Sequence, residues 1–317
     1  MLSRHAEDLF WIGRYVERAE DTARMLDVTY HGLLEAGAVE APTAWRELLE
    51  VLYVDEVFAG ELSASPVTLY LLADKHNSGS IVSAVARARE NARGVRDRIS
   101  SELWETINRF YLELAGIDLP NLLNRQPYEV FQLVKNRCQT ITGVALQTMP
   151  RDDGYRFLVL GIMLERAEMT CRLLSVRYTR LLRAGRTHDF HAWVAVLKSV
   201  SAFEAYLKAY RASLDPSKVL EFLLLAQDFP RSVVFALRTA ELMLTHLVTE
   251  GSATAVQRPL GRVRARAEFC DIDQIVVNGL DEFLHLLQED IWKVAEATER
   301  HFFQAGADLN LQSYETS

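Results

Sequence analysis

Two Glu-Arg pairs in similar surroundings are the residues of this sequence best suited to do chemistry. Residues 12–30 read IGRYVERAEDTARMLDVTY, and residues 160–178 read LGIMLERAEMTCRLLSVRY. Ten of the nineteen positions are identical at an offset of 148. On a helical wheel, each stretch places a stripe of two glutamates and one arginine beside an apolar stripe. Carboxylates in such places must be paired or must bind something, because a buried unpaired charge is costly.

The second stretch is apolar on nearly all sides, which predicts a buried helix with a partly buried charged stripe. Glu20 with Arg24, and Glu168 with Arg172, stand four residues apart and can pair within one helix. The two Glu-Arg pairs themselves have no obvious local partner. Three interpretations stay open: a charged network that fixes how the helices dock, a site for a small molecule or partner, and a metal site. The candidate binding residues of this group are Arg14, Glu17, Arg18, Glu20, Arg24, Glu165, Arg166, Glu168 and Arg172.

Helix-borne glutamates three residues apart can face a metal in a helical bundle. A di-iron carboxylate bundle needs two Glu-x-x-His elements, and only Glu282 with His285 offers a clear one. The arginines of both stripes add competing positive charge, so we expect no metal. We also expect no cofactor, since the sequence has no Gly-rich phosphate loop and no Gly-x-Ser-x-Gly elbow. The alternative is an independent enzyme, in which burial has raised the pKa values of the stripe glutamates and made them acids, bases or metal ligands.

A second polar stripe follows a long helix predicted from Ser80 to near Gly116. Its members recur at spacings of three and four residues, so they share one helix face. Trp104 among hydrogen-bonding groups is typical of a partner surface or a polar cleft. The simpler interpretation is a solvated face with salt bridges. The candidate binding residues on and beside this stripe are Glu90, Asn91, Arg93, Arg96, Asp97, Trp104 and Asn108.

Helical patterns fill nearly the whole chain and predict an all-α fold, a helical bundle. The 15 glycines and 8 prolines are few for a turn-rich β protein, and no stretch shows sustained strand alternation. A similar offset, 152 residues, separates Ser80 from Ser232, and each of these serines is expected to cap the start of a helix. We therefore predict two internally repeated units of about 150 residues. They are residues 1–150 and residues 151–306, packed as one domain, followed by a flexible tail at 307–317.

The overall charge argues against nucleic acid as a partner. The formal net charge is −8 and the pI is about 5.6, whereas nucleic-acid-binding domains are usually basic. No apolar run approaches the roughly 18–20 residues of a membrane span, and the first residues lack the apolar core of a signal peptide. The three cysteines lack metal-ligand spacing, which fits a reducing compartment. We predict a cytoplasmic protein without membrane contact, and we leave a homo-oligomer open.

The motifs resemble those of the bacterial Alpha-E family, a helical domain named for a Glu-Arg motif. The resemblance covers nearly the whole chain. The matching text comprises residues 1–4 (MLSR), 9–20 (LFWIGRYVERAE), Thr22, Arg24, 88–93 (ARENAR), 96–97 (RD), 101–102 (SE), Trp104, Asn108, 165–166 (ER) and 229–232 (FPRS).

The resemblance implies a functional setting and no catalytic residue. Family members resemble companions of a circularly permuted ATP-grasp ligase and a transglutaminase-like protein, encoded nearby or fused. That setting indicates ATP-dependent amide or peptide-bond formation. Since the chain shows no phosphate loop, we expect an accessory, non-catalytic helical subunit. It would bind the ligase or its peptide or amino-acid substrate.

Overall fold

Helices account for every regular element in the part of the chain that the structure describes. The computed structural model describes residues 1–36, 41–211, 214–248 and 254–304, and no strand occurs within these ranges. The all-α prediction is therefore confirmed. The tail predicted at 307–317 lies outside the described residues. Within the same ranges, no helix combines the length and apolar character that a bilayer crossing requires.

The first half of the chain forms a long central helix and six that follow it. They are α1 (Ser3–Ala36), α2 (Ala41–Val51), α3 (Ala64–Ala73), α4 (Ile81–Gly94), α5 (Ser101–Gly116), α6 (Leu119–Arg125) and α7 (Pro127–Thr148).

The second half begins with another long helix. Its elements are α8 (Asp153–Arg183), α9 (Phe190–Ser199), α10 (Phe203–Tyr210), α11 (Pro216–Leu225), α12 (Val233–Leu247), α13 (Thr254–Glu268), α14 (Ile272–Asn278), α15 (Leu280–Thr298) and the π-helical turn η1 (Glu299–Phe303).

Polar side chains set the starting points of several helices. A capping oxygen satisfies one of the backbone N–H groups that the first helical turn leaves without a partner. The side chains that accept a hydrogen bond from the N–H three residues further on include those of Ser80, Ser100, Asp152, Asp215 and Ser232.

The long helix predicted from Ser80 to Gly116 is divided into α4 and α5. α4 ends at Gly94, and the Ser100 hydroxyl caps α5 by accepting a hydrogen bond from Leu103 N at 3.1 Å. The prediction of one helix is wrong because the apolar spacing continues through both helices. A glycine and a capping serine end one helix and begin the next.

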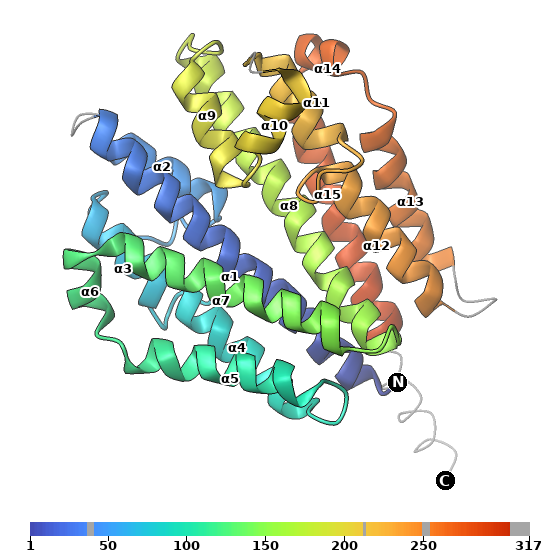
Figure 1. Ribbon diagram of the computed structural model, residues 1–317. Coiled ribbons are helices and arrows are strands. Elements are labelled where there is room, and N and C mark those ends of the chain that lie inside the picture. The colour runs from blue at the N-terminus through green and yellow to red at the C-terminus, as the bar shows by residue number, and fades with distance from the viewer. Residues whose placement is uncertain (37–40, 212–213, 249–253, 305–317) are drawn as a thin grey trace.

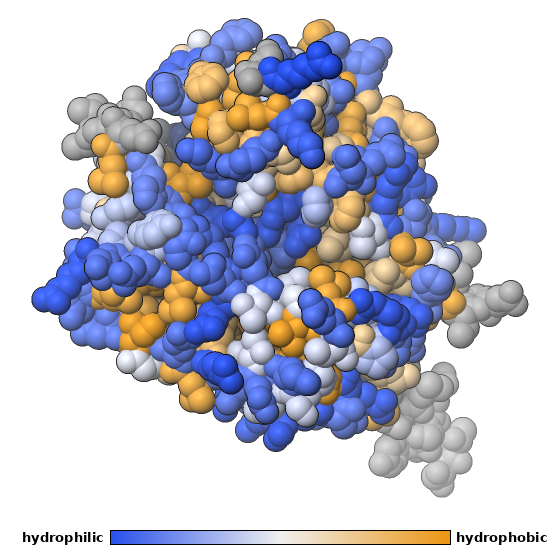
Figure 2. Space-filling view, viewed as in Figure 1, coloured by the Kyte–Doolittle hydropathy of each residue, from blue (hydrophilic) through white to orange (hydrophobic). Residues whose placement is uncertain are grey.

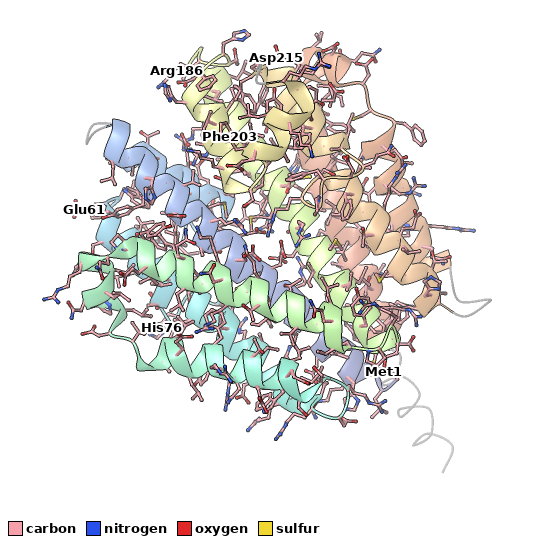
Figure 3. All side chains as sticks on the ribbon, in the orientation of Figure 1. Met1, Glu61, His76, Arg186, Phe203 and Asp215 are labelled. Carbon is pink, nitrogen blue, oxygen red and sulfur yellow. The ribbon has the colours of Figure 1, made fainter. Side chains whose placement is uncertain are left out.

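α1 and α8 form the centre of the bundle. α4 and α7 pack on α1, and α12 and α15 pack on α8. Figure 1 shows the helices of the first half in the lower left of the view and those of the second half in the upper right. Figure 3 shows side chains filling the space that the ribbons leave between the halves. The predicted internal repeat stays a prediction, although the two halves share this packing scheme.

α1 and α8 approach each other at two glycines. A Cβ atom on Gly13 would lie 2.2 Å from the oxygen of Leu158, and one on Gly161 would lie 2.1 Å from the oxygen of Phe10. No side chain fits at these distances, so only glycine allows the two backbones to touch. Each glycine stands four residues before a Glu-Arg pair. The contact between the backbones therefore brings the two pairs close together.

Candidate functional site

The two Glu-Arg pairs bind each other across the α1–α8 crossing. Arg18 Nε and Nη2 donate to the two carboxylate oxygens of Glu165 at 2.6 and 3.0 Å. In return, Arg166 Nε and Nη2 donate to the two oxygens of Glu17 at 2.7 and 2.8 Å. Both are bidentate pairs, the geometry that suits a planar guanidinium group. The residues that lacked a local partner in the sequence thus find one on the other helix.

One side of the crossing holds what we call the Glu17 cluster. Its members are Glu17, Glu20, Asp21, Arg24, Arg166 and Arg231. Arg231 comes from the connection before α12 and donates to Asp21 at 2.6 Å and to Glu20 at 2.9 Å. It also lies 2.9 Å from Glu17. With three arginines and three carboxylates, the cluster has no net charge when all its groups are ionised.

The other side holds what we call the Glu165 cluster. Its members are Arg14, Arg18, Glu165, Glu168 and Arg172. Arg14 joins the two glutamates, because it donates to Glu165 at 2.6 Å and to Glu168 at 2.5 Å. Arg172 pairs with Glu168, and the ring of Tyr53 covers its guanidinium carbon at 4.1 Å. Three arginines face two carboxylates here, so the cluster carries one excess positive charge.

Burial and ion pairing act in opposite directions on these carboxyl groups. Burial alone would raise the pKa of Glu17, but Arg166 and Arg231 outweigh it and leave that pKa below its usual value. Arg14 and Arg18 likewise overcome burial and lower the pKa of Glu165. Asp21 is different: burial, together with the nearby charges of Glu17 and Glu20, raises its pKa to about 7 despite the opposing charge of Arg231. The two motif glutamates are therefore fixed anions, whereas Asp21 can exchange a proton near neutral pH.

All nine candidates predicted from the two motifs meet at the α1–α8 crossing, and both predicted pairs within a helix are present. Three further residues of the two clusters, Asp21, Arg231 and Tyr53, were not among the predicted site residues. Asp21 follows the Glu20 of the motif directly, so its neighbourhood was visible. Arg231 was included only in the matching text of the family resemblance. No periodicity connects a residue between two helices with a partner about 210 residues away.

The second group of candidates does not lie on one helix face, because α4 and α5 are separate. Arg93 pairs with Glu90 on the exposed side of α4 at 2.8 Å. Around Trp104 a small cluster remains: Arg96 lies 4.9 Å from its ring. Arg89, which was not a candidate, donates to Asn108 at 2.8 Å.

The two other candidates of this group lie outside the Trp104 cluster. Asn91 reaches back to the carbonyl oxygen of Asp8 at 3.4 Å. Asp97 pairs with its exposed neighbour Arg98 at 3.1 Å. These positions form surface and packing contacts, and none of them is part of the Glu17 or Glu165 cluster.

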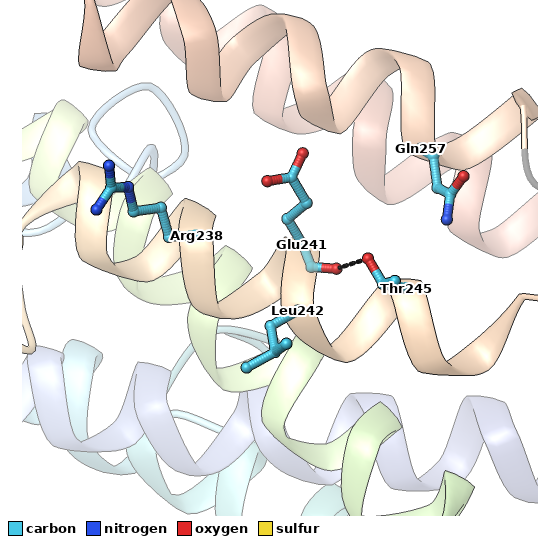
Figure 4. Close-up of a pocket in the computed structure, with 5 residues that line it drawn as sticks. All are labelled: Arg238, Glu241, Leu242, Thr245 and Gln257. Carbon is cyan, nitrogen blue, oxygen red and sulfur yellow. Dashed lines mark hydrogen bonds between the residues drawn. The ribbon is translucent and has the colours of Figure 1, made fainter.

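Within the described ranges, no group of three or more His, Cys, Asp or Glu residues could hold a metal ion. The Glu-x-x-His candidate lies on α15, where the His285 ring is exposed and sits 3.3 Å from Glu289. Two surface hollows are present elsewhere. The one between α12 and α13 has a volume of about 480 Å³ (Figure 4), and the other, about 630 Å³, is lined by residues between 57 and 76. Neither hollow is lined by a residue of the two charged clusters.

Figure 4 shows one hydrogen bond between residues that line the first hollow. The Thr245 hydroxyl donates to the Glu241 carbonyl oxygen at 2.8 Å, and Arg264 Nε lies 2.7 Å from the Glu241 carboxylate. Figure 2 shows hydrophilic residues gathered at the centre of the viewed face, where Figure 1 places α7, α1 and α8 near one another.

Comparison with known proteins gives a family and distant relatives. The profile of Alpha-E, described as "a predicted alpha-helical domain with a conserved ER motif", matches residues 1–303. An uncharacterized protein of Mycobacterium bovis is 24% identical over 93% of this chain. Uncharacterized proteins of two Mycobacterium tuberculosis strains are 24% and 23% identical over the same share. The chain spans 37% of the length of these relatives. No solved structure matches it significantly.

Proposed function

Because the chain belongs to the Alpha-E family, we propose that it is a helical accessory module of an ATP-grasp ligase system. The module binds the ligase, or the peptide or amino-acid substrate on which the ligase acts. It contributes positioning and recognition, and the ligase contributes the ATP site and amide-bond formation. ATP-dependent ligation belongs to the cytoplasm, so the proposal places the complex there. The transglutaminase-like protein of the same setting is a second proposed companion.

The commitment of the motif glutamates to ion pairs carries this proposal. Glu17 accepts two hydrogen bonds from Arg166, and Glu165 accepts from both Arg18 and Arg14. Their lowered pKa values make proton donation at neutral pH unfavourable. The oxygens are also occupied by arginine donors, which leaves little room for a metal. Such a motif locks two helices together, and this role suits a scaffold better than an active site.

The length of the relatives adds support. Since this chain spans only 37% of them, those proteins contain further sequence beside the matching region. An accessory module that acts with a second unit is compatible with such a fused arrangement.

The test is capture of partners by the tagged chain in the native organism, with the bound proteins identified by mass spectrometry. We expect an ATP-grasp protein in stoichiometric amount. Recovery of the chain alone, from cells that express the ligase, would contradict the proposal. Trp104→Ala, at the aromatic surface between α4 and α5, should weaken capture without unfolding the protein. Leu242→Ala, at the exposed surface of α12, is the matched control.

A second candidate function is favoured by Asp21. A buried carboxyl group whose pKa is about 7 has the proton affinity that general acid–base catalysis needs. In that case the chain is an enzyme in its own right, and Asp21→Asn would abolish turnover by the isolated protein while leaving partner capture intact. An accessory module would instead show no turnover by the isolated chain, with or without the substitution, so turnover is the measurement that separates the two functions.

A further inference from the structure

The arginines of the Glu165 cluster have donor groups that the protein does not use. Arg14, Arg18 and Arg172 each direct Nη2 to a carboxylate. In the described part of the chain, Nη1 of each arginine donates to no carboxylate or carbonyl oxygen. Arg172 Nε is buried and also has no acceptor, and the ring and the hydroxyl of Tyr53 both act on this guanidinium group. Three neighbouring cations thus keep unused N–H groups.

The terminal nitrogens of the Glu17 cluster are all used, although Arg24 Nε is buried without an acceptor there, as Arg172 Nε is in the Glu165 cluster. Arg166 Nη1 donates to the Pro230 carbonyl oxygen at 3.1 Å, and its Nη2 donates to Glu17. Arg24 donates to Ser201 and Glu20 through its two terminal nitrogens. Those of Arg231 donate to Asp21 and Glu20. All six terminal nitrogens on this side have an acceptor, so the difference between the two clusters lies in the Nη1 groups.

The three free nitrogens belong to guanidinium groups that lie close together. Arg14 shares Glu165 with Arg18 and shares Glu168 with Arg172. Arg172 also acts on the pKa of Glu165. The three groups therefore surround one pair of carboxylates. Their summed charge exceeds that of the carboxylates by one, and an anion placed among them would neutralise the excess.

The cluster is reachable from solvent. The Arg18 side chain is 25% exposed and the Arg172 side chain 18%, while Arg14 is 9% exposed. The aromatic wall beside them is also partly open: Trp11 lies 5.5 Å from the Arg14 guanidinium carbon, and Tyr53 is exposed over more than half its surface. The side chains of Arg18 and Arg172 are therefore in contact with solvent.

We infer that the Glu165 cluster is a binding site for an oxyanion, a carboxylate or a phosphate group, held by Arg14, Arg18 and Arg172. A tetrahedral or planar oxyanion accepts hydrogen bonds from several guanidinium groups at once, which a single charge such as chloride does less well. Anion binding at this cluster depends on contacts within the chain alone, so it does not require the proposed ligase partnership.

Isothermal titration calorimetry on the full chain tests this inference. The probes are inorganic phosphate and acetate, each titrated at fixed ionic strength in a chloride buffer that contains no other oxyanion. We expect saturable binding of at least one probe with a stoichiometry of one. Binding of phosphate alone assigns a phosphate group, and binding of acetate alone assigns a carboxylate. No binding of either probe overturns the inference.

A matched pair of variants places the anion. Arg172→Gln removes the excess charge and should weaken binding about tenfold or more, because a charge-assisted hydrogen bond is lost. Arg24→Gln is the control: it breaks the equivalent pair in the Glu17 cluster and should leave the affinity unchanged. Equal weakening in both variants would contradict the assigned site.

A second pair keeps the test decisive if Arg172→Gln does not fold. Arg18→Lys keeps a positive charge beside Glu165 but removes the free Nη1, so anion binding should again weaken several-fold. Arg166→Lys makes the same change opposite Glu17, where Nη1 is already engaged, and should not affect binding. Circular dichroism and thermal unfolding confirm that each variant is folded. Unchanged binding in folded Arg18→Lys would overturn the inference.

Discussion

The Glu17 cluster and the Glu165 cluster start from the same Glu-Arg motif and end in different states. The Glu17 cluster has balanced charges and an acceptor for every terminal guanidinium nitrogen. The Glu165 cluster has one more cation than anion, and the Nη1 atoms of its three arginines donate to no carboxylate or carbonyl oxygen among the described residues. The motif and the glycine contact therefore fix how α1 and α8 cross. They do not determine whether the charges beside the crossing are fully satisfied.

The residues that flank the motifs produce the difference. Asp21 supplies the third carboxylate of the Glu17 cluster, and the position at the same offset of 148 holds Met169. The connection before α12 supplies Arg231 and the carbonyl oxygen of Pro230. The connection before α4 turns back on itself instead, since Asn77 donates to the carbonyl oxygen of Tyr70 at 3.2 Å. Similar helices thus acquire different sites from their connections.

Removal of a bridging arginine should have the largest effect and should distinguish the two clusters. Arg231→Gln leaves three buried carboxylates facing two cations, so we expect a loss of about 3–5 kcal/mol in the free energy of unfolding. Arg14→Gln leaves two carboxylates facing two arginines in the Glu165 cluster. The free energy of unfolding should therefore fall less, by about 1–3 kcal/mol. Urea unfolding of both variants measures the difference. Equal losses would show that charge balance does not separate the clusters.

Asp21→Asn should change how stability depends on pH. The pKa of Asp21 in the folded protein, about 7, exceeds its usual value of about 3.9. The folded state therefore holds a proton that the unfolded state releases, and the resulting stability is lost as pH rises from about 4 to 7. Asparagine stays neutral at every pH. Between pH 5 and pH 8, the free energy of unfolding of the variant should therefore rise relative to that of the wild type by on the order of a few kcal/mol.

Unfolding curves at pH 5, 6, 7 and 8 measure this effect. The Glu165 cluster has no counterpart of Asp21, so Met169→Leu provides a control that should not alter the pH dependence. Parallel stability profiles of the wild type and Asp21→Asn would contradict the raised pKa.

Gly161→Ala should damage both clusters together. The added Cβ would stand 2.1 Å from the oxygen of Phe10, so the two helices must separate. We expect a loss of about 1–3 kcal/mol, typical of overpacking. Thermal unfolding gives the size of the loss, and Gly143→Ala, at a helical glycine with open space around it, is the control. Double variants that combine Gly161→Ala with Arg231→Gln or with Arg14→Gln show which cluster the glycine supports. If the loss of stability from Gly161→Ala is non-additive with only one of the two arginine substitutions, the idea of a shared crossing is refuted.

Tyr53→Phe should have the smallest effect and act on the Glu165 cluster alone. Tyr53 donates its hydroxyl to Gln288 at 2.6 Å while its ring covers Arg172. Loss of the hydrogen bond should cost about 0.5–1.5 kcal/mol. Ser201→Ala is the matched change beside Arg24, since Ser201 and Tyr53 both have positive φ angles and stand 148 residues apart. No loss from Tyr53→Phe would mean that the hydroxyl does not hold the ring in place.

The spacing of apolar residues in the sequence predicted much of the fold, and the spacing of charged residues predicted part of the site. The apolar character of residues 160–178 correctly indicated a buried helix, and the four-residue spacing of Glu168 and Arg172 correctly indicated an ion pair. Pairing across the crossing could not be read, because the partners stand about 150 residues apart. The same limit applies to Arg231. The wrong single helix at 80–116 shows that a continuous apolar stripe does not reveal a short interruption.

The glycine contact has a consequence for tracing distant relatives. The string Glu-Arg is short and common, so it identifies little when it stands alone. A glycine four residues earlier adds a steric condition, because only Gly-x-x-x-Glu-Arg permits the backbone approach seen at Gly13 and Gly161. Two copies of that six-residue string, on two long helices, form a search pattern that tests geometry as well as composition. Chains that carry both copies should share this crossing even where the rest of their sequence has diverged.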